Sequence, residues 1–444
     1  MSYVPHTKKE VEEMLRVIGV SSIEELFKDI GPALRPSSFN IPEGKSEFEV
    51  KEHLERLSLK NNTNLINFVG GGFYDHYIPA VVDALAGRSE FYTSYTPYQP
   101  ECSQGTLQAM YEYQTAICIL TEMDVANASL YDGGTALFEA VMMSLRITGK
   151  NKIIIDGGIN PIYKNMLFTH TANLPVDLIK IPPHIGQTKR EEIYRHLDEK
   201  TAAVILQNPN FFGTIDIHSD IVEKAHSLGA LVIESVYPIS LGLIKTPGSM
   251  GVDIVTGDGQ SLGIPLSFGG PYFGFLACKR KFLRKVPGRI VGETIDKEGK
   301  RGFTLTLQTR EQHIRRQKAT SNICTNSALC ALRAVIFLSI LGENGFVEFS
   351  KLNYEKSEFT KNLLKNIPGV EVINSPTFNE FTILLKKNAD EIVNNMINKG
   401  IAAGLPLGRF YKGMKNYLLI TVTEKRKKEE ILRLAEGLNN AINL

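Results

Sequence analysis

The chain has 444 residues, a net charge of +2 and 43% hydrophobic residues, as expected for a soluble globular protein with two or three domains. Its basic residues are spread among almost as many acidic ones, which argues against nucleic-acid binding. The N-terminus lacks the basic and apolar regions of a signal peptide. The most apolar stretch, 327–342, is short and carries Arg333, so no membrane span is expected.

The cysteines are widely spaced and form neither a CxxC pair nor a Cys/His metal-binding pattern. Their odd number predicts free thiols in a reducing cytosol, and no metal site. They are Cys102, Cys118, Cys278, Cys324 and Cys330.

Residues 1–60 are predicted to form a helical arm. Thr7, Ser22 and Ser46 are each followed three residues later by a glutamate, the pattern of a capping box, and Gly19 would end the first helix. These short amphipathic helices cannot form a core alone, so they must dock on another surface. A partner subunit and the body of the same chain are equally compatible with the pattern.

Residues 61–330 alternate short apolar strands with helices such as 189–198 and 217–228. This alternation predicts a large, doubly wound, mostly parallel α/β domain, in which ligands bind at the carboxyl ends of strands. The expected strands are Lys152–Ile155, Asp177–Ile181, Ala203–Gln207, Ala230–Glu234, Asp253–Thr256 and Gly274–Ala277.

Residues 331–444 are predicted to hold a linking helix and a smaller α/β domain. A long helix ends at Lys365, and two further helices are expected at Ala389–Lys399 and from Arg426. The expected strands are Val370–Ile373, Phe381–Leu385 and Tyr417–Val422.

Two glycine-rich segments are candidates for ligand contact. Gly133, Gly134 and Thr135 precede an apolar helix, where free backbone N–H groups could cradle a phosphate, although an ordinary glycine turn fits equally well. The segment 257–271, rich in glycine and proline, suggests close approach to a ligand or to another chain. It contains no lysine, histidine or cysteine, so a covalent nucleophile is missing there.

An aromatic loop and a cationic segment are the other candidates. The loop 91–101 either lines a pocket, faces a partner or packs on its own domain; its relevant residues are Tyr92, Tyr95, Tyr98, Gln99 and Glu101. The segment 310–325 suits carboxylate or phosphate recognition, or forms a solvated helix face, through Arg310, Arg315, Arg316 and Lys318.

The histidines are weaker candidates. His313, within the cationic segment, is expected to be structural, and His218 and His226 are expected to be exposed on a helix. Asp75 and His76 follow a glycine run and could line a pocket, but no third metal ligand accompanies them.

Several long strings together resemble the P protein of the glycine cleavage system, in its form with two different subunits. They cover nearly the whole chain and are far more specific than any short motif. The strings are Tyr3-Val-Pro-His-Thr7, Tyr95-Thr-Pro-Tyr-Gln-Pro-Glu101, Ser103-Gln-Gly105, Leu305-Thr-Leu-Gln-Thr-Arg-Glu-Gln-His-Ile-Arg-Arg316 and Lys318-Ala-Thr-Ser-Asn-Ile-Cys-Thr325.

The resemblance implies a fold-type-I pyridoxal-phosphate enzyme scaffold with its active site at a subunit interface. In that family the cofactor lysine precedes an Ile-Pro pair and a glycine run. The same pattern here puts Gln260 at the lysine position, with Ser261 beside it, and Glu234 where the fold keeps an acid against the pyridine nitrogen. This chain therefore resembles subunit 1, which lacks the lysine, and the cofactor would be bound covalently by the second subunit.

The resemblance also implies partners and residue roles. The expected complex contains two copies of each subunit, is cytoplasmic, decarboxylates glycine and passes the aminomethyl group to the lipoyl H protein. Thr320 and Ser321 would approach the phosphate of the partner's cofactor, and the tyrosines would wall the glycine site. Arg310, Arg315 or Arg316 would hold a carboxylate or attract the acidic carrier.

Two other functions compete with this one. A self-sufficient pyridoxal-phosphate lyase or transaminase would need another lysine; Lys279 and Lys281 are nearest, but they lie in or after the next strand and would point elsewhere. A non-catalytic protein that only recruits the carrier would need no lysine.

Overall fold

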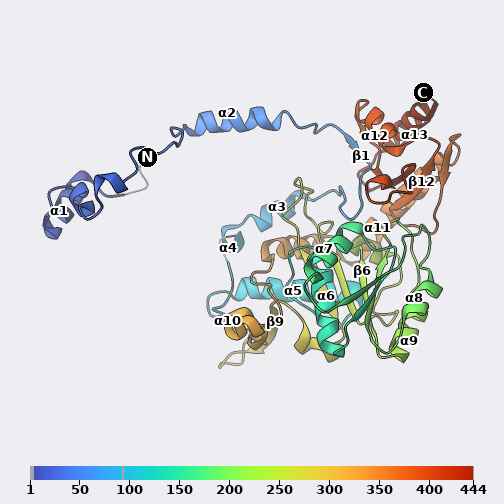
Figure 1. Ribbon diagram of the computed structural model, residues 1–444, viewed down its shortest axis with the longest axis horizontal. Coiled ribbons are helices and arrows are strands. Elements are labelled where there is room, and N and C mark those ends of the chain that lie inside the picture. The colour runs from blue at the N-terminus through green and yellow to red at the C-terminus, as the bar shows by residue number, and fades with distance from the viewer. Residues whose placement is uncertain (1–4, 93–94, 444) are drawn as a thin grey trace. The chain divides into compact units, whose positions relative to one another are not determined.

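The computed structural model describes residues 5–92 and 95–443 (Figure 1). The chain divides into two compact units, residues 1–63 and 64–444. The first is the predicted helical arm, and the second contains a seven-stranded sheet, a four-stranded sheet and two smaller two-stranded sheets.

The arm consists of short helical elements with capped starts. Thr7 and Ser46 each form the predicted capping box, and Gly19 ends the first helix with φ +85°. Ser22 caps a 3₁₀ turn rather than an α-helix. Tyr3 and Val4, part of the string that suggested the family, lie outside the described residues. The elements are α1 (Lys8–Ile18), η1 (Ile23–Phe27), η2 (Pro32–Leu34) and α2 (Glu47–Ser58).

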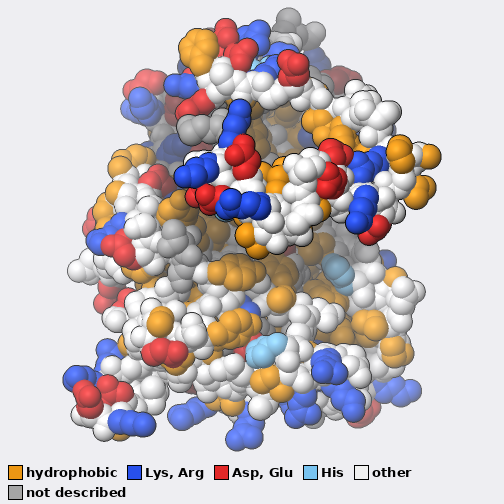
Figure 2. All heavy atoms as spheres, turned by 90° about the vertical axis from the view of Figure 1, so that its left-hand side faces the viewer, with side chains coloured by type: hydrophobic (Ala, Val, Ile, Leu, Met, Phe, Trp, Pro, Cys, Tyr) orange, Lys and Arg blue, Asp and Glu red, His pale blue; other side chains and the backbone are white. Residues whose placement is uncertain are grey.

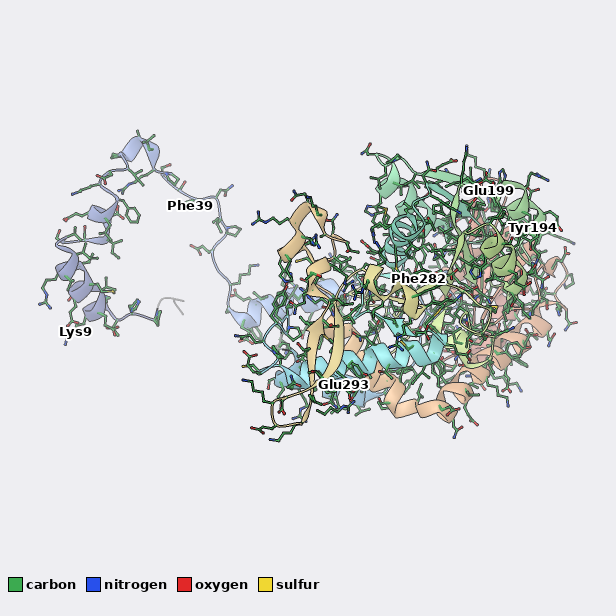
Figure 3. All side chains as sticks on the ribbon, turned by 90° about the horizontal axis from the view of Figure 1, so that it is seen from below. Lys9, Phe39, Tyr194, Glu199, Phe282 and Glu293 are labelled. Carbon is green, nitrogen blue, oxygen red and sulfur yellow. The ribbon has the colours of Figure 1, made fainter. Side chains whose placement is uncertain are left out.

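The apolar side chains of the arm are open to solvent. None of the residues in its four elements is buried. Val17 on α1 is 85% exposed, and Phe39, labelled in Figure 3, is 72% exposed. The arm therefore presents amphipathic helices without burying their apolar faces.

The larger sheet of the body has seven strands in the order β2-β8-β7-β6-β5-β3-β4. Strands β3 to β7 are parallel, whereas β8 runs antiparallel to both of its neighbours. All the strands predicted between 152 and 277 are present, and only the two-residue β2 was missed. The bounds are β2 (Val125–Ala126), β3 (Lys152–Ile155), β4 (Asp177–Lys180), β5 (Thr201–Asn208), β6 (Leu231–Val236), β7 (Ile254–Asp258) and β8 (Gly274–Cys278).

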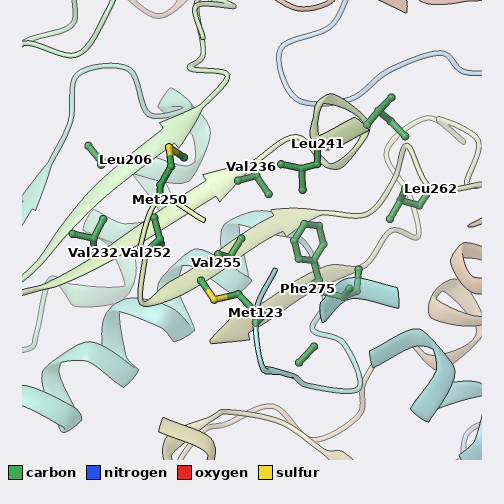
Figure 4. Close-up of a cluster of buried hydrophobic side chains, with 14 of the residues drawn as sticks. Met123, Leu206, Val232, Val236, Leu241, Met250, Val252, Val255, Leu262 and Phe275 are labelled. Atoms are coloured by element: carbon green, nitrogen blue, oxygen red, sulfur yellow. The ribbon is translucent and has the colours of Figure 1, made fainter. Parts of the chain in front are cut away.

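Helices cover both faces of this sheet (Figure 1). One face packs on α6 (Gly133–Thr148) and α7 (Pro161–Thr171). The opposite face, part of which Figure 4 shows, packs on a larger group of helices. Those helices are α5 (Gln104–Thr121), α8 (Arg190–His196), α9 (Ser219–Ser227) and α11 (Ala328–Leu364). The nearly continuous apolar strands follow from burial on both faces.

Shorter elements surround the large sheet. The hairpin of β9 (Ile290–Ile295) and β10 (Arg301–Thr306) was not predicted, and it is bonded to α5 through Gln104 and Gln114. The remaining elements are α3 (Ala80–Ala86), α4 (Ser89–Tyr92), η3 (Pro238–Gly242), η4 (Arg280–Lys285), η5 (Gln308–Arg310), α10 (Gln312–Arg315) and η6 (Arg316–Lys318).

The C-terminal part forms a second, antiparallel sheet in the order β11-β12-β15-β14, with a core of its own. β1 (Ile66–Asn67) pairs in parallel with β13 (Ile401–Ala402), so the first strand after the arm joins the C-terminal part. The elements are β11 (Val370–Val372), β12 (Glu380–Leu385), α12 (Ala389–Ile397), β14 (Leu405–Pro406), η7 (Leu407–Arg409), β15 (Tyr417–Thr421) and α13 (Lys428–Asn443).

Helix α11 is, among the described residues, the one helix long and apolar enough to cross a membrane by length and composition. The core helix of a soluble protein passes the same test. Gly342 interrupts α11 with φ +59° and ψ −173°, and Ala331, Phe337 and Phe346 are buried in the core of the large sheet. Helix α11 is therefore a broken core helix.

Candidate functional site

Gln260, at the position expected for a cofactor lysine, is buried and fully hydrogen-bonded. Its Oε1 accepts from the N–H of Tyr74 at 2.8 Å, and its Nε2 donates to the carbonyl of Tyr74 at 3.0 Å and to that of Ile264 at 2.8 Å. The side chain thus mimics a strand partner for Tyr74. It fixes the segment after β1 to the loop after β7, a structural task that a lysine could not perform.

The glycine turn at the start of α6 is already filled by carboxylates of the chain. Asp258 Oδ2 accepts from the N–H of Gly133 at 2.9 Å, and Asp132 Oδ1 accepts from the N–H of Thr135 at 2.8 Å. A Cβ on Gly134 would lie 2.4 Å from Met166 Sδ, so no space remains beside it. Internal acids therefore engage the N–H groups of Gly133 and Thr135 in this conformation, and the phosphate cradle stays a prediction.

Asp258 is a buried acid in this loop that the sequence did not single out. Burial raises the pKa of Asp258 to about 7, against the opposing effect of N–H donation from Gly133 and Gln260. The sequence signal for Asp258 is its position two residues before Gln260. An acid at that position does not by itself indicate a site, because it cannot replace a cofactor lysine.

Glu380, at the start of β12, closes the same region from the C-terminal sheet. It accepts from Gly71 N–H at 2.6 Å, Tyr74 Oη at 2.7 Å and Thr421 Oγ1 at 2.6 Å. Burial raises its pKa as well. Gly70 is required at this point, since a Cβ there would lie 2.2 Å from Glu380 Oε1.

Only a small cavity remains between these groups. Its volume is about 30 Å³, and its walls include Gly72, Tyr74, Asn160, Tyr163, Asp258 and Glu380. That volume suits about one or two water molecules, whereas a pocket for an organic ligand has roughly 300–1,000 Å³. A pyridoxal-phosphate-sized group therefore does not fit at this position in the chain.

Glu234 lies on β6 and is fully buried, but its neighbour is a histidine. Its Oε2 is 2.9 Å from His218 Nδ1. The expectation that His218 is exposed is wrong, because the ring is completely buried at the start of α9. His226 is exposed, as expected, and its Nε2 lies 2.7 Å from Asp253 Oδ2. The helix pattern could not reveal that each histidine contacts an acid from another segment.

Asp75 and His76 join the segment after β1 to the segment after β15. His76 Nδ1 lies 2.7 Å from Glu424 Oε2, and its Nε2 contacts Tyr237 Oη. Asp75 accepts from Lys425 Nζ at 2.6 Å. No cluster of three or more candidate metal ligands occurs within the described ranges.

In the glycine-rich segment 257–271 the close approach is to the chain itself. A Cβ on Gly259 would lie 1.9 Å from the ring of Phe273, the residue just before β8. The tip is different, because Ser267 and Phe268 have positive φ angles and Phe268 is 91% exposed. The segment thus combines a packed stem with a strained aromatic tip.

The tyrosine loop and the segment 310–325 come together in the body. Tyr95 Oη lies 3.0 Å from Thr325 Oγ1, and the ring of Tyr98 packs edge-on against His313 with centroids 5.4 Å apart. Arg289, which the sequence did not suggest, joins them by donating to Tyr98 Oη at 2.9 Å. Tyr95 is 76% exposed, and Tyr92, Gln99 and Glu101 are exposed too. Thr93 and Ser94 of this loop lie outside the described residues.

The cations of this segment have different roles. Arg310 donates to the carbonyls of Val286, Leu307 and Gly288, and burial lowers its pKa. Its contact with a ligand carboxylate stays a prediction. By contrast, Arg315, Arg316 and Lys318 are exposed.

Thr320 and Ser321 are half-buried behind these cations. The N–H of Thr320 donates to the carbonyl of Arg310 at 2.9 Å, and Ser321 Oγ accepts from the N–H of Ile323 at 3.0 Å. Their proposed contact with a phosphate stays a prediction.

The two alternative lysines face away from the cavity. Lys279 Nζ lies 3.2 Å from Asp253 Oδ1 and also donates to the carbonyl of Gly251. Lys281 Nζ lies 3.8 Å from the same Asp253 oxygen. Neither lysine is among the residues that line the cavity near Gln260.

The strand order, the antiparallel β8 and the smaller C-terminal sheet define the fold of the fold-type-I pyridoxal-phosphate enzymes. A sphingosine-1-phosphate lyase of Burkholderia pseudomallei has this fold, with a TM-score of 0.69 and 14% identity over 93% of this chain and 94% of that chain. At that identity the likeness concerns the fold alone.

Closer comparisons define the family. The model of the glycine cleavage system P-protein family matches residues 1–438. A crystal structure of an inhibitor-bound glycine decarboxylase (P-protein) has a TM-score of 0.91 and 42% identity, over 99% of this chain and 100% of that one. A probable glycine dehydrogenase (decarboxylating) subunit 1 of Geotalea uraniireducens is 58% identical over the full length of both chains. The chain belongs to the glycine cleavage system P-protein family.

Proposed function

We propose that this chain is the subunit 1 of a two-subunit glycine decarboxylase and completes the active site of a lysine-bearing partner. The observation that supports the proposal is Gln260, the residue at the expected lysine position, whose amide is fully bonded near a cavity of about 30 Å³. Full-length relatives named subunit 1 support a second subunit. Pyridoxal phosphate on that partner would supply the electron sink for decarboxylation.

The surface offered to the partner is the tyrosine loop together with the segment 310–325. Tyr95 and Tyr98 present rigid rings whose hydroxyls are held at 3.0 Å and 2.9 Å by neighbouring groups. Such rings can wall a substrate as small as glycine and exclude water from it. Thr320 and Ser321 lie in the same segment and would reach the phosphate of the partner's cofactor.

The arm provides a second contact with the partner. Its apolar side chains are exposed, and on the face of the molecule drawn in Figure 2 hydrophobic side chains lie among charged ones. Burial of these faces against the second subunit would stabilise an assembly that contains two copies of each chain. The free cysteines support a reducing, cytoplasmic location for this assembly.

The decisive experiment mixes purified components. The chain alone with added pyridoxal phosphate is expected to stay colourless and to give no borohydride-trapped adduct. Addition of the second subunit is expected to produce both the colour and glycine-dependent CO₂ release. A trapped adduct on this chain alone would overturn the proposal in favour of a self-sufficient enzyme.

A matched substitution tests the tyrosine loop. Tyr95→Ala is expected to lower glycine–CO₂ exchange by the assembled complex at least about tenfold, because the wall of the site is lost. Tyr354→Ala serves as control, since Tyr354 is a partly exposed tyrosine on α11. Equal activities of the two variants would remove the tyrosine loop from the site.

A recruiting role for the lipoyl carrier is the second candidate function. The side chains of Arg316 and Lys318 are exposed, and within the described chain no hydrogen bond or ion pair engages them. They would attract an acidic carrier over a distance of about 10 Å in ordinary buffer. Charge reversal of both should raise the KM for the carrier and reduce its salt dependence, while CO₂ exchange without carrier is unchanged.

A further inference from the structure

Arg289 is a buried cation at the centre of the surface formed by the tyrosine loop and the segment 310–325. It directly precedes β9, and its side chain is 4% exposed. A guanidinium removed from water must be paired and hydrogen-bonded, otherwise its burial is strongly unfavourable. The groups that satisfy Arg289 therefore indicate what it holds in place.

Three segments distant in sequence meet at this guanidinium. One terminal nitrogen donates to Tyr98 Oη at 2.9 Å, and the other donates to Asn326 Oδ1 at 3.2 Å. Nε lies 3.6 Å from Glu311 Oε2. A planar fork with donors in fixed directions can hold three groups at set angles, whereas a lysine ammonium cannot.

The two neighbours of the guanidinium are themselves fixed. Asn326 donates to the carbonyl of Ala128 at 2.9 Å, and the N–H of Ala128 donates to the carbonyl of Arg289 at 2.8 Å. On the other side, Glu311 approaches His313, whose ring packs against Tyr98. The arginine thus connects Asn326 and Ala128, which are bonded to each other, to the exposed ring of Tyr98.

The backbone around Glu311 is held in an unfavourable conformation. Leu307 and Arg316, on either side of it, have φ angles of +54° and +52°, in the left-handed region that favours glycine. Non-glycine residues persist there only when surrounding contacts impose the conformation, and such strain collects at ligand clamps and active sites. Arg289 pairs with Glu311 of this strained segment at 3.6 Å, and Arg310 ties the segment further by donating to the carbonyls of Val286 and Gly288.

The buried cluster also has unused hydrogen-bonding capacity. Arg289 Nε and Glu311 Oε1 are both buried without a hydrogen-bond partner among the described residues.

We infer that Arg289 is a positioning residue for glycine decarboxylation, because it fixes Tyr98 and the segment 308–316 in the orientation that the partner's active site requires. The inference rests on the function proposed above. Arg289 is too buried to touch the substrate, so it acts through the tyrosine and through Glu311.

The test uses the complex assembled with the second subunit. Arg289→Gln is expected to lower kcat/KM for glycine about ten- to a hundredfold, since a displacement of about 1 Å in a positioning group has effects of that size. The KM for the lipoyl carrier should not change. Arg289→Lys should rescue little, because an ammonium cannot reproduce the fork. Arg301→Gln is the control, since Arg301 pairs with Glu293 at 2.8 Å on the exposed hairpin.

A double-mutant cycle separates positioning from general stability. If Arg289 acts through Tyr98, then Arg289→Gln combined with Tyr98→Phe will lose no more activity than the worse single variant. Amide hydrogen exchange of residues 95–101 and 308–316 should rise in Arg289→Gln while α5 and α11 stay protected.

Specific outcomes would overturn the inference. Unchanged glycine kinetics in a folded Arg289→Gln complex would remove Arg289 from the site. Strictly additive losses with Tyr98→Phe would show that it does not act through the tyrosine. If Tyr95→Ala lowers activity but Arg289→Gln does not, only this inference fails; if neither does, the proposed function of the surface fails too.

Discussion

Two regions of the body contain buried charged groups. They differ in whether the residues bonded to those groups are buried or exposed. Around Gln260 the buried carboxyls of Asp258 and Glu380 accept hydrogen bonds from the chain itself, and a cavity of about 30 Å³ remains. Around Arg289 the buried cation holds an exposed aromatic loop by donating to Tyr98 Oη at 2.9 Å.

Around Gln260 the internal donors and acceptors bond to one another, so the first region is part of the core. In the second region, buried Arg289 fixes Tyr98, whose ring is partly exposed, and such an arrangement suits contact with a partner chain. The experiments below test this contrast, beginning with the largest expected effect.

Removal of the Glu380 carboxylate should destabilise the closed region most. Glu380→Ala leaves the N–H of Gly71 and the hydroxyls of Tyr74 and Thr421 without their acceptor, and should lower the free energy of unfolding by about 4 kcal/mol. Glu380→Gln, which keeps one acceptor oxygen, should lose less. Urea denaturation measures both variants, with Glu293→Ala on the exposed hairpin as control. A loss below that of the control would mean that the region is not closed by this residue.

Gln260→Lys should fail to create a cofactor site. The amide that bonds Tyr74 is lost and a cation is buried, so stability should fall by about 3 kcal/mol. Pyridoxal phosphate should still give neither colour nor a borohydride-trapped adduct. Gln108→Lys on the exposed face of α5 is the matched control for an added lysine. A trapped adduct specific to position 260 would show that the cavity can expand to admit pyridoxal phosphate. The region around Gln260 would then no longer count as closed.

Asp258 should give the closed region a pH dependence. Burial raises its folded pKa to about 7, above the value of about 3.9 expected in the unfolded chain. The folded state therefore binds more protons between these values, and the contribution of Asp258 to stability is full below pH 4 and is lost as the pH rises towards 7.

The difference in unfolding free energy between the native chain and Asp258→Asn isolates this contribution, because other titrating groups cancel. The difference should change by about 2–4 kcal/mol between pH 4 and 7. A difference that does not vary with pH would mean that the carboxyl keeps its ordinary pKa.

Thr325→Val should have the smallest effect and should act only on the open region. It removes the partner of Tyr95 Oη, at 3.0 Å, from a half-exposed position. Stability should change by less than about 0.5 kcal/mol, whereas glycine exchange by the complex should fall about two- to threefold as the tyrosine gains freedom. Thr169→Val, which removes an exposed hydroxyl bonded within α7, should affect neither quantity.

The architecture was predictable because its signals are local and repeated. Apolar runs located β3 to β8, and capping boxes located α1 and α2, whereas the two-residue β2 carries too little pattern to detect. Long irregular strings such as 305–316 indicated the family, and with it Gln260.

The site was less predictable because its contacts join distant residues. Glu380 meets Gly71 across 309 positions, and Arg289 meets Tyr98 across 191 positions, so no sequence window contains both partners. Arg310 is the reverse case. Its charge predicts ligand binding, but in the fold its guanidinium already donates to three backbone carbonyls. The residue type identifies a possible hydrogen-bond donor. Only the fold shows whether that donor is already bonded within the chain.

The open apolar faces of the arm have a consequence for synthesis of the protein. Val17, Leu34 and Phe39 are not buried by other residues of the arm, and exposed apolar side chains promote self-association. Because α1 and α2 are capped locally, the arm can keep its helices while it awaits a partner. The chain is therefore expected to accumulate in soluble form when the second subunit is produced beside it, and to aggregate when it is overproduced alone.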